Sequence, residues 1–437
     1  MRSFLIACAV LAGCRNAEPT EDVAEQVGER YITIGTDALP TLRATADNAA
    51  VIETTGDFAV VAVDAQDLEA LSEEMHEHHH RCGGFMVHDT LDDALSVQRD
   101  GRKPIEYTLD RPAAVRAALP SIREDAILGT IRELSAMQNR YYQSPTGAAA
   151  SEWLRDRWLS FTDREDVTVE LFDQGYAQKS VILTIPGTTR ADEVVVLGGH
   201  LDSIALGGRN SHAPGADDDA SGIATLTEIT RVLLAKDYRP ARTIKVIAYA
   251  AEEVGLRGSL AVVKELKKRR INVVGALQLD MTNYQGSDRD IWLMKDFTDA
   301  AQNAFLIQLI DTYVGATWGY DACGYACSDH ASWTRAGVPA SMPFESRMNE
   351  RNQVIHTKKD TLEMSNENAT HAVKFAQLGA AYAIEMGKGE LRAPAVEVAA
   401  STDNSGWRLL VGGIAGVLAL AGIAIVRRIS RHTGDHP

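Results

Sequence analysis

The segment at residues 194–200 constrains the fold of this chain more than any other. Three valines and a leucine in succession are typical of a strand that is buried on both faces of a parallel sheet. This apolar run continues directly into Gly198, Gly199, His200, Leu201 and Asp202. Because ligands bind at the carboxyl ends of strands in open α/β sheets, we expect His200 and Asp202 to lie at a ligand site.

The pattern around this strand predicts one large α/β domain over residues 106–388. Apolar runs and helical periodicities alternate there, which favours a mixed, largely parallel central sheet flanked by helices. The predicted helices are residues 127–138, 147–159, 221–236, 258–269, 299–314 and 368–386. The predicted strands are residues 179–185, 193–197, 243–248 and 273–279.

A smaller α/β unit precedes this domain, within residues 15–105. Strands are predicted at residues 31–34 and 58–63 and a helix at residues 67–78, followed by an exposed basic linker around residue 102 that suits a protease. The cluster His76–His80 with Cys82 allows a metal site. However, neighbouring histidines on a helix point in different directions, which favours a solvated polar turn.

Composition limits the classes of function. A chain of 437 residues suggests two domains with extensions, and 45% apolar with 24% charged residues is typical of a globular protein. The formal net charge of −16 argues against a nucleic-acid partner, because the phosphates would be repelled.

Both ends of the chain resemble targeting segments. Residues 1–14 have one basic residue and an apolar core, as in an export signal, and the end at Cys14 resembles a lipoprotein signal with Cys14 lipidated. An ordinary cleaved signal is the alternative. After a linker at residues 389–406, the tail at residues 407–437 contains an uncharged apolar run followed by arginines. It predicts a transmembrane helix or a sorting tail, with a buried helix as the alternative. We therefore expect an exported protein, held at the cell envelope or secreted after processing.

Imidazole and carboxylate side chains recur where predicted strands end. They are His200, Asp218, Glu252, Glu253 and Asp280, and His356 follows later in the chain. Two imidazoles and four carboxylates suit a pair of zinc ions. Two metals about 3.5–4 Å apart stabilise both the attacking and the leaving side of a hydrolytic reaction.

With these segments in order, the chain resembles the secreted bacterial di-zinc leucyl aminopeptidases, which are co-catalytic zinc exopeptidases. The resemblance covers about residues 113–387. It rests on Gly-Gly-His200-Leu-Asp-Ser, Ala-Pro-Gly-Ala-Asp-Asp218-Asp-Ala-Ser-Gly, Ala-Tyr-Ala-Ala-Glu252-Glu253-Val-Gly-Leu, Leu-Gln-Leu-Asp280-Met, Cys323-Gly-Tyr325-Ala-Cys327-Ser-Asp-His, Met-Pro-Phe344-Glu-Ser and Ile-His356-Thr. The N-terminal unit then corresponds to a propeptide that masks the active site.

The resemblance implies a role for each ligand. Asp218 would bridge two zinc ions, with His200 and Asp280 on one and Glu253 and His356 on the other. Asp202 would fix the tautomer of His200. The peptide bond after Asp218 is expected to be cis.

It also implies the chemistry of an aminopeptidase acting on peptides with a free N-terminus. A zinc-bridged hydroxide would attack the scissile carbonyl, with Glu252 as the general base. Tyr325, held by a Cys323–Cys327 disulfide, would donate a hydrogen bond to the oxyanion. Two free buried thiols are the alternative to that disulfide.

A leucine-like preference follows from positions that line the family's apolar pocket. They are Met281, Cys323, Met342, Phe344, Met348, Arg351 and Ile355. Met348 and Arg351 depart from the aromatic residues of the family, and ordinary core packing is the alternative for the whole set. We further expect an activating protease and a monomeric catalytic domain. The rival functions are a zinc carboxypeptidase or dipeptidase of the same clan, a glutaminyl cyclase, and a non-catalytic surface binding module.

Overall fold

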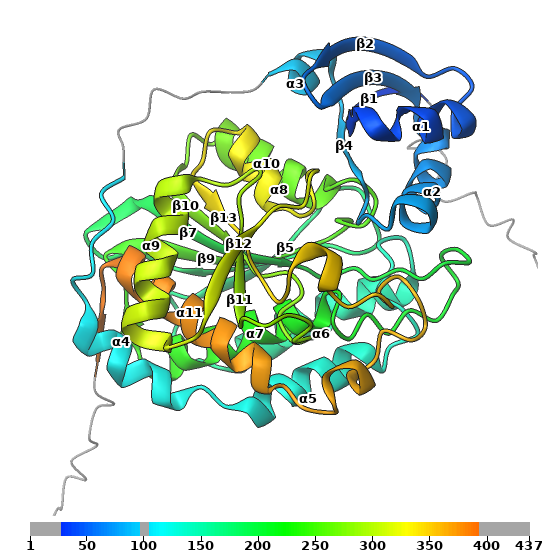
Figure 1. Ribbon diagram of the computed structural model, residues 1–437. Coiled ribbons are helices and arrows are strands. Elements are labelled where there is room, and N and C mark those ends of the chain that lie inside the picture. The colour runs from blue at the N-terminus through cyan, green and yellow to red at the C-terminus, as the bar shows by residue number, and fades with distance from the viewer. Residues whose placement is uncertain (1–27, 97–104, 393–437) are drawn as a thin grey trace, which may run out of the picture. The chain divides into compact units, whose positions relative to one another are not determined.

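The structure, a computed structural model, describes residues 28–96 and 105–392 (Figure 1). Four predicted features lie outside these residues: the export signal, Cys14, the basic linker and the apolar tail. Among the described helices, none has the length and apolar character needed to cross a membrane.

The N-terminal unit is a four-stranded antiparallel sheet with helices packed on it. Its strands follow the order β2-β3-β1-β4. Alternate residues of β1 and β3, such as Ile32, Ile34 and Val61, form its core with Leu71 and Met75 of α2. The elements are β1 (Glu29–Gly35), α1 (Leu39–Thr45), β2 (Ala50–Thr55), β3 (Phe58–Asp64), α2 (Leu68–His79), β4 (Phe85–His88) and α3 (Leu91–Leu95).

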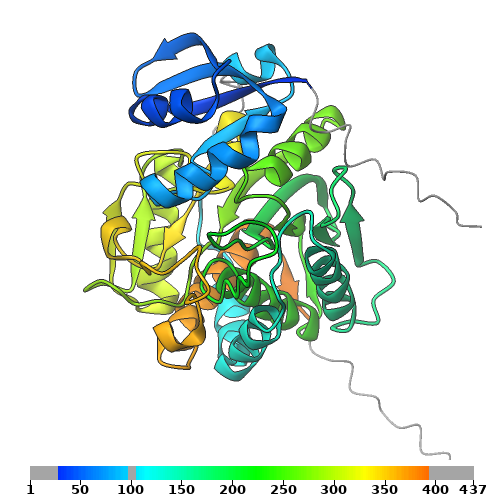
Figure 2. The ribbon, with the colours of Figure 1, turned by 90° about the vertical axis from the view of Figure 1, so that its right-hand side faces the viewer.

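The large domain, which Figure 2 shows turned by 90°, contains a separate six-stranded sheet. Its strands follow the order β13-β10-β7-β9-β6-β5. Its strands are β5 (Thr168–Phe172), β6 (Ser180–Ile185), β7 (Arg190–His200), β9 (Arg242–Tyr249), β10 (Asn272–Gln278) and β13 (Ala340–Ser341). The strands from β13 to β9 are parallel, whereas β6 and β5 are antiparallel to their neighbours. The prediction of a mixed, largely parallel sheet is therefore confirmed.

Helices cover both faces of this sheet (Figure 1). They are α4 (Pro112–Ala118), α5 (Glu124–Ser135), α6 (Pro145–Leu159), α7 (Ala220–Ala235), α8 (Arg257–Lys268), α9 (Ala300–Leu309), α10 (His330–Arg335) and α11 (Thr370–Gly387). The helix predicted over residues 299–314 changes from α9 into a π-helical turn at Ile310–Val314.

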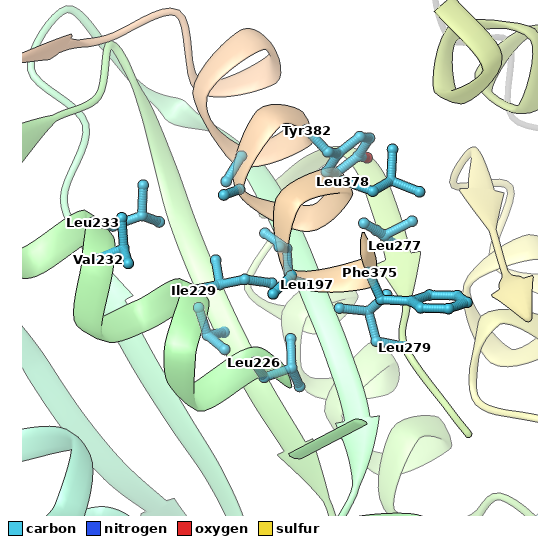
Figure 3. Close-up of a cluster of buried hydrophobic side chains, with 14 of the residues drawn as sticks. Leu197, Leu226, Ile229, Val232, Leu233, Leu277, Leu279, Phe375, Leu378 and Tyr382 are labelled. Carbon is cyan, nitrogen blue, oxygen red and sulfur yellow. The ribbon is translucent and has the colours of Figure 1, made fainter. Parts of the chain in front are cut away.

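The valine-rich strand β7 shows why the sheet is covered on both faces. Val195 and Leu197 face the large core formed with α7 and α11, while Val194 and Val196 face α8 and α10. In the large core, Leu197 lies among side chains of α7, β10 and α11 (Figure 3). A strand that is buried on both faces fixes the position of its own carboxyl end, where His200 stands.

Short elements that the sequence pattern did not predict form two smaller sheets. Strands β11 (Ile291–Met294), β12 (Trp318–Asp321) and β14 (Pro343–Phe344) make one, and β8 (Tyr238–Arg239) with β15 (Glu390–Leu391) makes the other. Runs of two to four residues are too short to show a periodicity, so tertiary pairing determines these strands.

Acid is expected to destabilise the N-terminal unit through His88. This buried imidazole in β4 lies 3.0 Å from the hydroxyl oxygen of Thr33, and burial, aided by Arg335, lowers its pKa to about 3. The neutral form therefore contributes stability that is fully present above pH 6.5 and is lost as the pH falls toward 3. One such group changes the free energy of unfolding by about 1.4 kcal/mol per pH unit, or about 2 kcal/mol between pH 7 and pH 5.

Urea unfolding of the wild type and of His88→Gln at pH 7 and at pH 5 measures the contribution of His88 to the free energy of unfolding. The difference in stability between pH 7 and pH 5 should be about 2 kcal/mol smaller in the variant. His80→Gln, at an exposed histidine of the same unit, should leave the difference unchanged. Equal pH dependence of wild type and His88→Gln would contradict the assignment.

Candidate metal centre

Four segments bring acidic and imidazole side chains to one edge of the central sheet. His200 is the last residue of β7, and Asp280 follows β10. Glu252 and Glu253 follow β9, while Asp218 lies just before α7. Because β10, β7 and β9 are parallel neighbours, their carboxyl ends meet at the same edge.

The predicted ligands form two groups that share Asp218. His200 Nε2 lies 2.9 Å from Asp218 Oδ1 and 3.5 Å from Asp280 Oδ1. His356 Nε2 lies 3.0 Å from Asp218 Oδ2 and 3.1 Å from Glu253 Oε2. Each oxygen of Asp218 therefore faces a different group, which is the arrangement required of a carboxylate that bridges two cations.

The buried charges of this centre fit metal ions. Within the described residues, Asp218 Oδ1, Asp280 Oδ1 and both oxygens of Glu253 are buried, and apart from nearby histidine nitrogens they have no hydrogen-bond partner. Burial lowers the pKa of His356, but Glu253 and Asp218 outweigh it and raise the value to about 10. The buried carboxylates therefore stabilise positive charge at this centre. Imidazole and carboxylate ligands are those that zinc prefers, so the donor set fits.

Asp202 has a different main contact from the one predicted. Its carboxylate accepts hydrogen bonds from the backbone N–H groups of Glu252 (3.0 Å) and Glu253 (3.1 Å). Its Oδ1 lies 3.5 Å from Nδ1 of His200, which is closer, at 3.2 Å, to the carbonyl oxygen of Asp202. Asp202 therefore positions the loop after β9 as well as standing beside His200.

Two further carboxylates hold the Asp218 loop and were missed by the sequence reasoning. Asp360 accepts hydrogen bonds from the backbone N–H groups of Asp217 and Asp218, both at 3.1 Å. Asp219 accepts them from His200 (3.0 Å) and Met281 (3.1 Å). A lone acidic residue four positions after His356 is the only signal that sequence offers for Asp360. The Asp218–Asp219 peptide bond is cis, as the family resemblance implies.

Arg140 was also missed, although it lies at the base of the centre. Its side chain is fully buried and donates hydrogen bonds to the carbonyl oxygens of Leu201 (2.9 Å), Pro214 (2.7 Å) and Gly215 (2.9 Å). It thereby connects the loop after β7 with the loop that carries Asp218.

Glu252 and Tyr325 lie near the ligands. Glu252 is fully buried, and neither carboxylate oxygen hydrogen-bonds to another described residue. Burial raises its pKa well above the usual range; His200 opposes this, and Glu253 adds to it. Tyr325 lies in the loop closed by the Cys323–Cys327 disulfide, and its hydroxyl oxygen accepts the backbone N–H of Cys82 at 3.3 Å.

Six of the seven predicted pocket residues belong to one apolar cluster. They are Met281, Cys323, Met342, Phe344, Met348 and Ile355, and the cluster also contains Tyr325, Cys327, Met294 and Cys82. Arg351 differs, because its guanidinium donates to the carbonyl oxygens of Met348 and His80, both at 2.6 Å. It therefore contacts the N-terminal unit.

The interpretation of residues 76–82 as a solvated polar turn is wrong for His76 and Cys82. Both side chains are buried, whereas His78 and His80 are exposed. His76 continues the buried stripe Leu68, Leu71, Ser72, Met75 on α2, which is the spacing of a helix face. That periodicity was the signal in the sequence that could have placed His76 inside.

The sequence of this chain is similar to those of known peptidases. Residues 180–381 match the family described as Peptidase family M28. Leucine aminopeptidase 1 of Uncinocarpus reesii is 36% identical over 329 residues, which are 70% of this chain and 81% of that protein. Leucine aminopeptidase 1 of Emericella nidulans is 36% identical over 62% of this chain and 73% of its own length.

Two solved structures from Legionella pneumophila are similar over most of the chain. The LapA aminopeptidase superimposes with a TM-score of 0.72 at 28% identity, covering 84% of this chain and 100% of that one. LapB gives a TM-score of 0.70 at 30% identity, covering 82% of this chain and 100% of that one.

Proposed function

Because the chain belongs to peptidase family M28 and is a metal-dependent aminopeptidase, we propose that it uses two zinc ions to remove large apolar residues from the amino termini of peptides. The observation that carries the proposal is the position of Asp218 between two ligand groups. One of its oxygens faces His200 and the other faces His356.

Each metal would be held by three protein side chains. His200, Asp218 and Asp280 form one set, and Asp218, Glu253 and His356 are protein ligands of the other. Bound zinc would polarise the scissile carbonyl and lower the pKa of a water to about 7. Asp202, Asp219 and Asp360 hold the ligand-bearing loops by their backbone N–H groups, so the ligands need not reorganise when the ions bind.

Glu252 is proposed to move the proton. Its oxygens are buried and free of hydrogen bonds to described residues, so they are available to a water molecule or a substrate group. The carboxylate accepts a proton from the attacking water and passes it to the leaving amine. Two cations bound beside Glu252 would favour its charged form, which can accept a proton.

Tyr325 would stabilise the charge that develops on the carbonyl oxygen. Burial raises the pKa of its hydroxyl well above the usual value, so it keeps its proton and can donate it in a hydrogen bond. The Cys323–Cys327 disulfide restricts the loop that carries it.

Selectivity for apolar side chains is proposed to arise from the cluster around Met281 and Phe344. Methionines make such a pocket adaptable, because their side chains are flexible and polarisable. Met348 packs against this cluster, whereas the guanidinium of Arg351 donates hydrogen bonds to carbonyl oxygens. Of these two residues, Met348 is therefore the one that adds apolar surface to the pocket.

The biological setting is also part of the proposal. The N-terminal and C-terminal segments favour an exported protein, held by lipid on Cys14 or by the apolar tail, or released after processing. A protease that cuts between the N-terminal unit and the catalytic domain would activate it, and the catalytic domain would act as a monomer.

Release of p-nitroaniline from leucine-p-nitroanilide tests the activity, using the full chain before and after limited proteolysis. A chelator should abolish turnover and added zinc should restore it, with two zinc ions per chain by elemental analysis. Leucine should be preferred to alanine by about 10-fold or more, because each buried methylene contributes to binding. An amino-blocked substrate is the negative control. Absence of turnover by zinc-loaded, proteolysed protein would refute the proposal.

A further inference from the structure

A short segment of the N-terminal unit, residues 81–84, lies inside the candidate active site. The backbone N–H of Cys82 donates to the hydroxyl of Tyr325 at 3.3 Å, and the guanidinium of Arg81 lies over the ring of Tyr325, 4.9 Å from its centre. Cys82 itself belongs to the apolar cluster with Met281 and Phe344. The segment therefore occupies space that a substrate would need.

The sulfur of Cys82 faces the metal ligands directly. It lies 3.5 Å from Nε2 of His356 and 3.8 Å from Oδ2 of Asp218. Ligand atoms of Cys82, Asp218, Glu253 and His356 all lie within 4.8 Å of one another. Glu253 Oε2 faces the Nε2 atoms of His356 at 3.1 Å and His76 at 3.4 Å, and Oε1 has no hydrogen-bond partner among the described residues, so the carboxylate can share a cation with the sulfur.

His76 supports the segment and lies beside the metal group, with its Nε2 3.4 Å from Oε2 of Glu253. Its Nε2 accepts the backbone N–H of Gly83 at 3.1 Å, and its ring packs edge-on against that of His356, with the centroids 4.4 Å apart. One turn earlier on α2, the hydroxyl of Ser72 donates a hydrogen bond to the carbonyl oxygen of Glu253 at 2.9 Å. The helix is thus fastened to the loop that carries Glu252 and Glu253.

Gly83 permits the close approach of this turn. Its φ of +51° lies in the left-handed region, and a Cβ there would stand 2.9 Å from the backbone nitrogen of Gly255 and 3.3 Å from the carbonyl oxygen of Glu252. Only glycine fits without moving the loop after β9. The conformation of this turn therefore places the Cys82 side chain at the metal centre.

We propose that Cys82 is a sulfur ligand of the metal bound by Asp218, Glu253 and His356, and that it keeps the precursor inactive. The inference rests on the proposed function, because it requires the metal centre. On coordination a sulfur–metal bond forms, and the thiol proton passes to solvent. No oxidation or reduction is involved. Zinc readily takes one cysteine sulfur together with imidazole and carboxylate ligands. The position needed by substrate or water is then filled until the N-terminal unit leaves.

Cobalt substitution of the full chain tests the sulfur bond without relying on activity. The wild type should show a sulfur-to-cobalt charge-transfer band in the near ultraviolet, and X-ray absorption of the zinc protein should show a sulfur at about 2.3 Å. Cys82→Ser and Cys82→Ala should lose both signals while binding the same number of ions. Cys14→Ser, the matched control, should keep both.

Turnover of leucine-p-nitroanilide by the same full-length proteins tests the inhibition. Because activity follows the fraction of molecules with an open site, kcat/KM should rise about tenfold or more in Cys82→Ser. Unchanged activity in both Cys82 variants would overturn the inhibitory role.

The two proposals fail in different ways. Normal binding of two ions with no sulfur signal in the wild type would overturn the role of Cys82 and leave the proposed function standing. Failure of the wild type and of both variants to bind metal would overturn the proposed function itself, and the inference with it.

Discussion

Replacing Glu252 with glutamine is expected to lower kcat by about 100-fold to 10,000-fold, the contribution usually made by a general base. The amide has nearly the shape of the carboxylate but cannot accept a proton from water. Glu252 belongs to neither of the two groups of described residues that could hold a metal ion, so zinc content should stay at the wild-type level. Steady-state kinetics on proteolytically activated protein and elemental analysis measure the two quantities.

Glu253→Gln is the matched control for this substitution, because it changes the adjacent residue in the same way. Glu253 Oε2 lies 3.1 Å from His356 Nε2, within the group shared with Asp218. We therefore expect the control to lose zinc as well as activity. If Glu252→Gln lost zinc while Glu253→Gln kept it, the two roles would have to be exchanged.

The large domain could be predicted because its strands carry strong local signals. The valine-rich run of β7 is buried on both faces, and its neighbours β9 and β10 are similarly apolar. A parallel sheet then brings the residues after these strands to one edge, so His200, Glu253 and Asp280 could be placed near one another from the pattern alone.

Residues that act through long-range backbone contacts could not be predicted in this way. Asp360 and Asp202 hold the backbone of distant loops, and no periodicity reveals which N–H a carboxylate accepts. Cys82 reaches the centre through a turn that depends on a glycine and on the packing of one helix. Only the three-dimensional arrangement brings it to residues more than a hundred positions away.

Arg140→Met is expected to lower the free energy of unfolding by about 3 kcal/mol or more. The substitution removes the donors from three buried carbonyl oxygens, those of Leu201, Pro214 and Gly215. The oxygen of Gly215 still accepts the backbone N–H of Ala220 at 3.1 Å, so the oxygens of Leu201 and Pro214 are the two that lose their donor. Each buried acceptor left without a partner destabilises a protein by about 1–3 kcal/mol. Burial lowers the pKa of Arg140 and the nearby carboxylates of Asp219 and Asp360 oppose this, so the charge also balances the acidic centre.

Urea unfolding of the wild type, Arg140→Met and Arg132→Met measures this effect. Arg132 lies exposed on α5 in the same part of the chain, so its replacement should change stability by no more than about 0.5 kcal/mol. Arg140→Lys should recover only part of the loss, because one ammonium group cannot reach three carbonyl oxygens in the planar arrangement of a guanidinium. The two loops that Arg140 joins carry His200 and Asp218, so zinc affinity should fall together with stability. Wild-type stability in Arg140→Met would show that these carbonyl oxygens find other donors, and that the centre does not depend on this guanidinium.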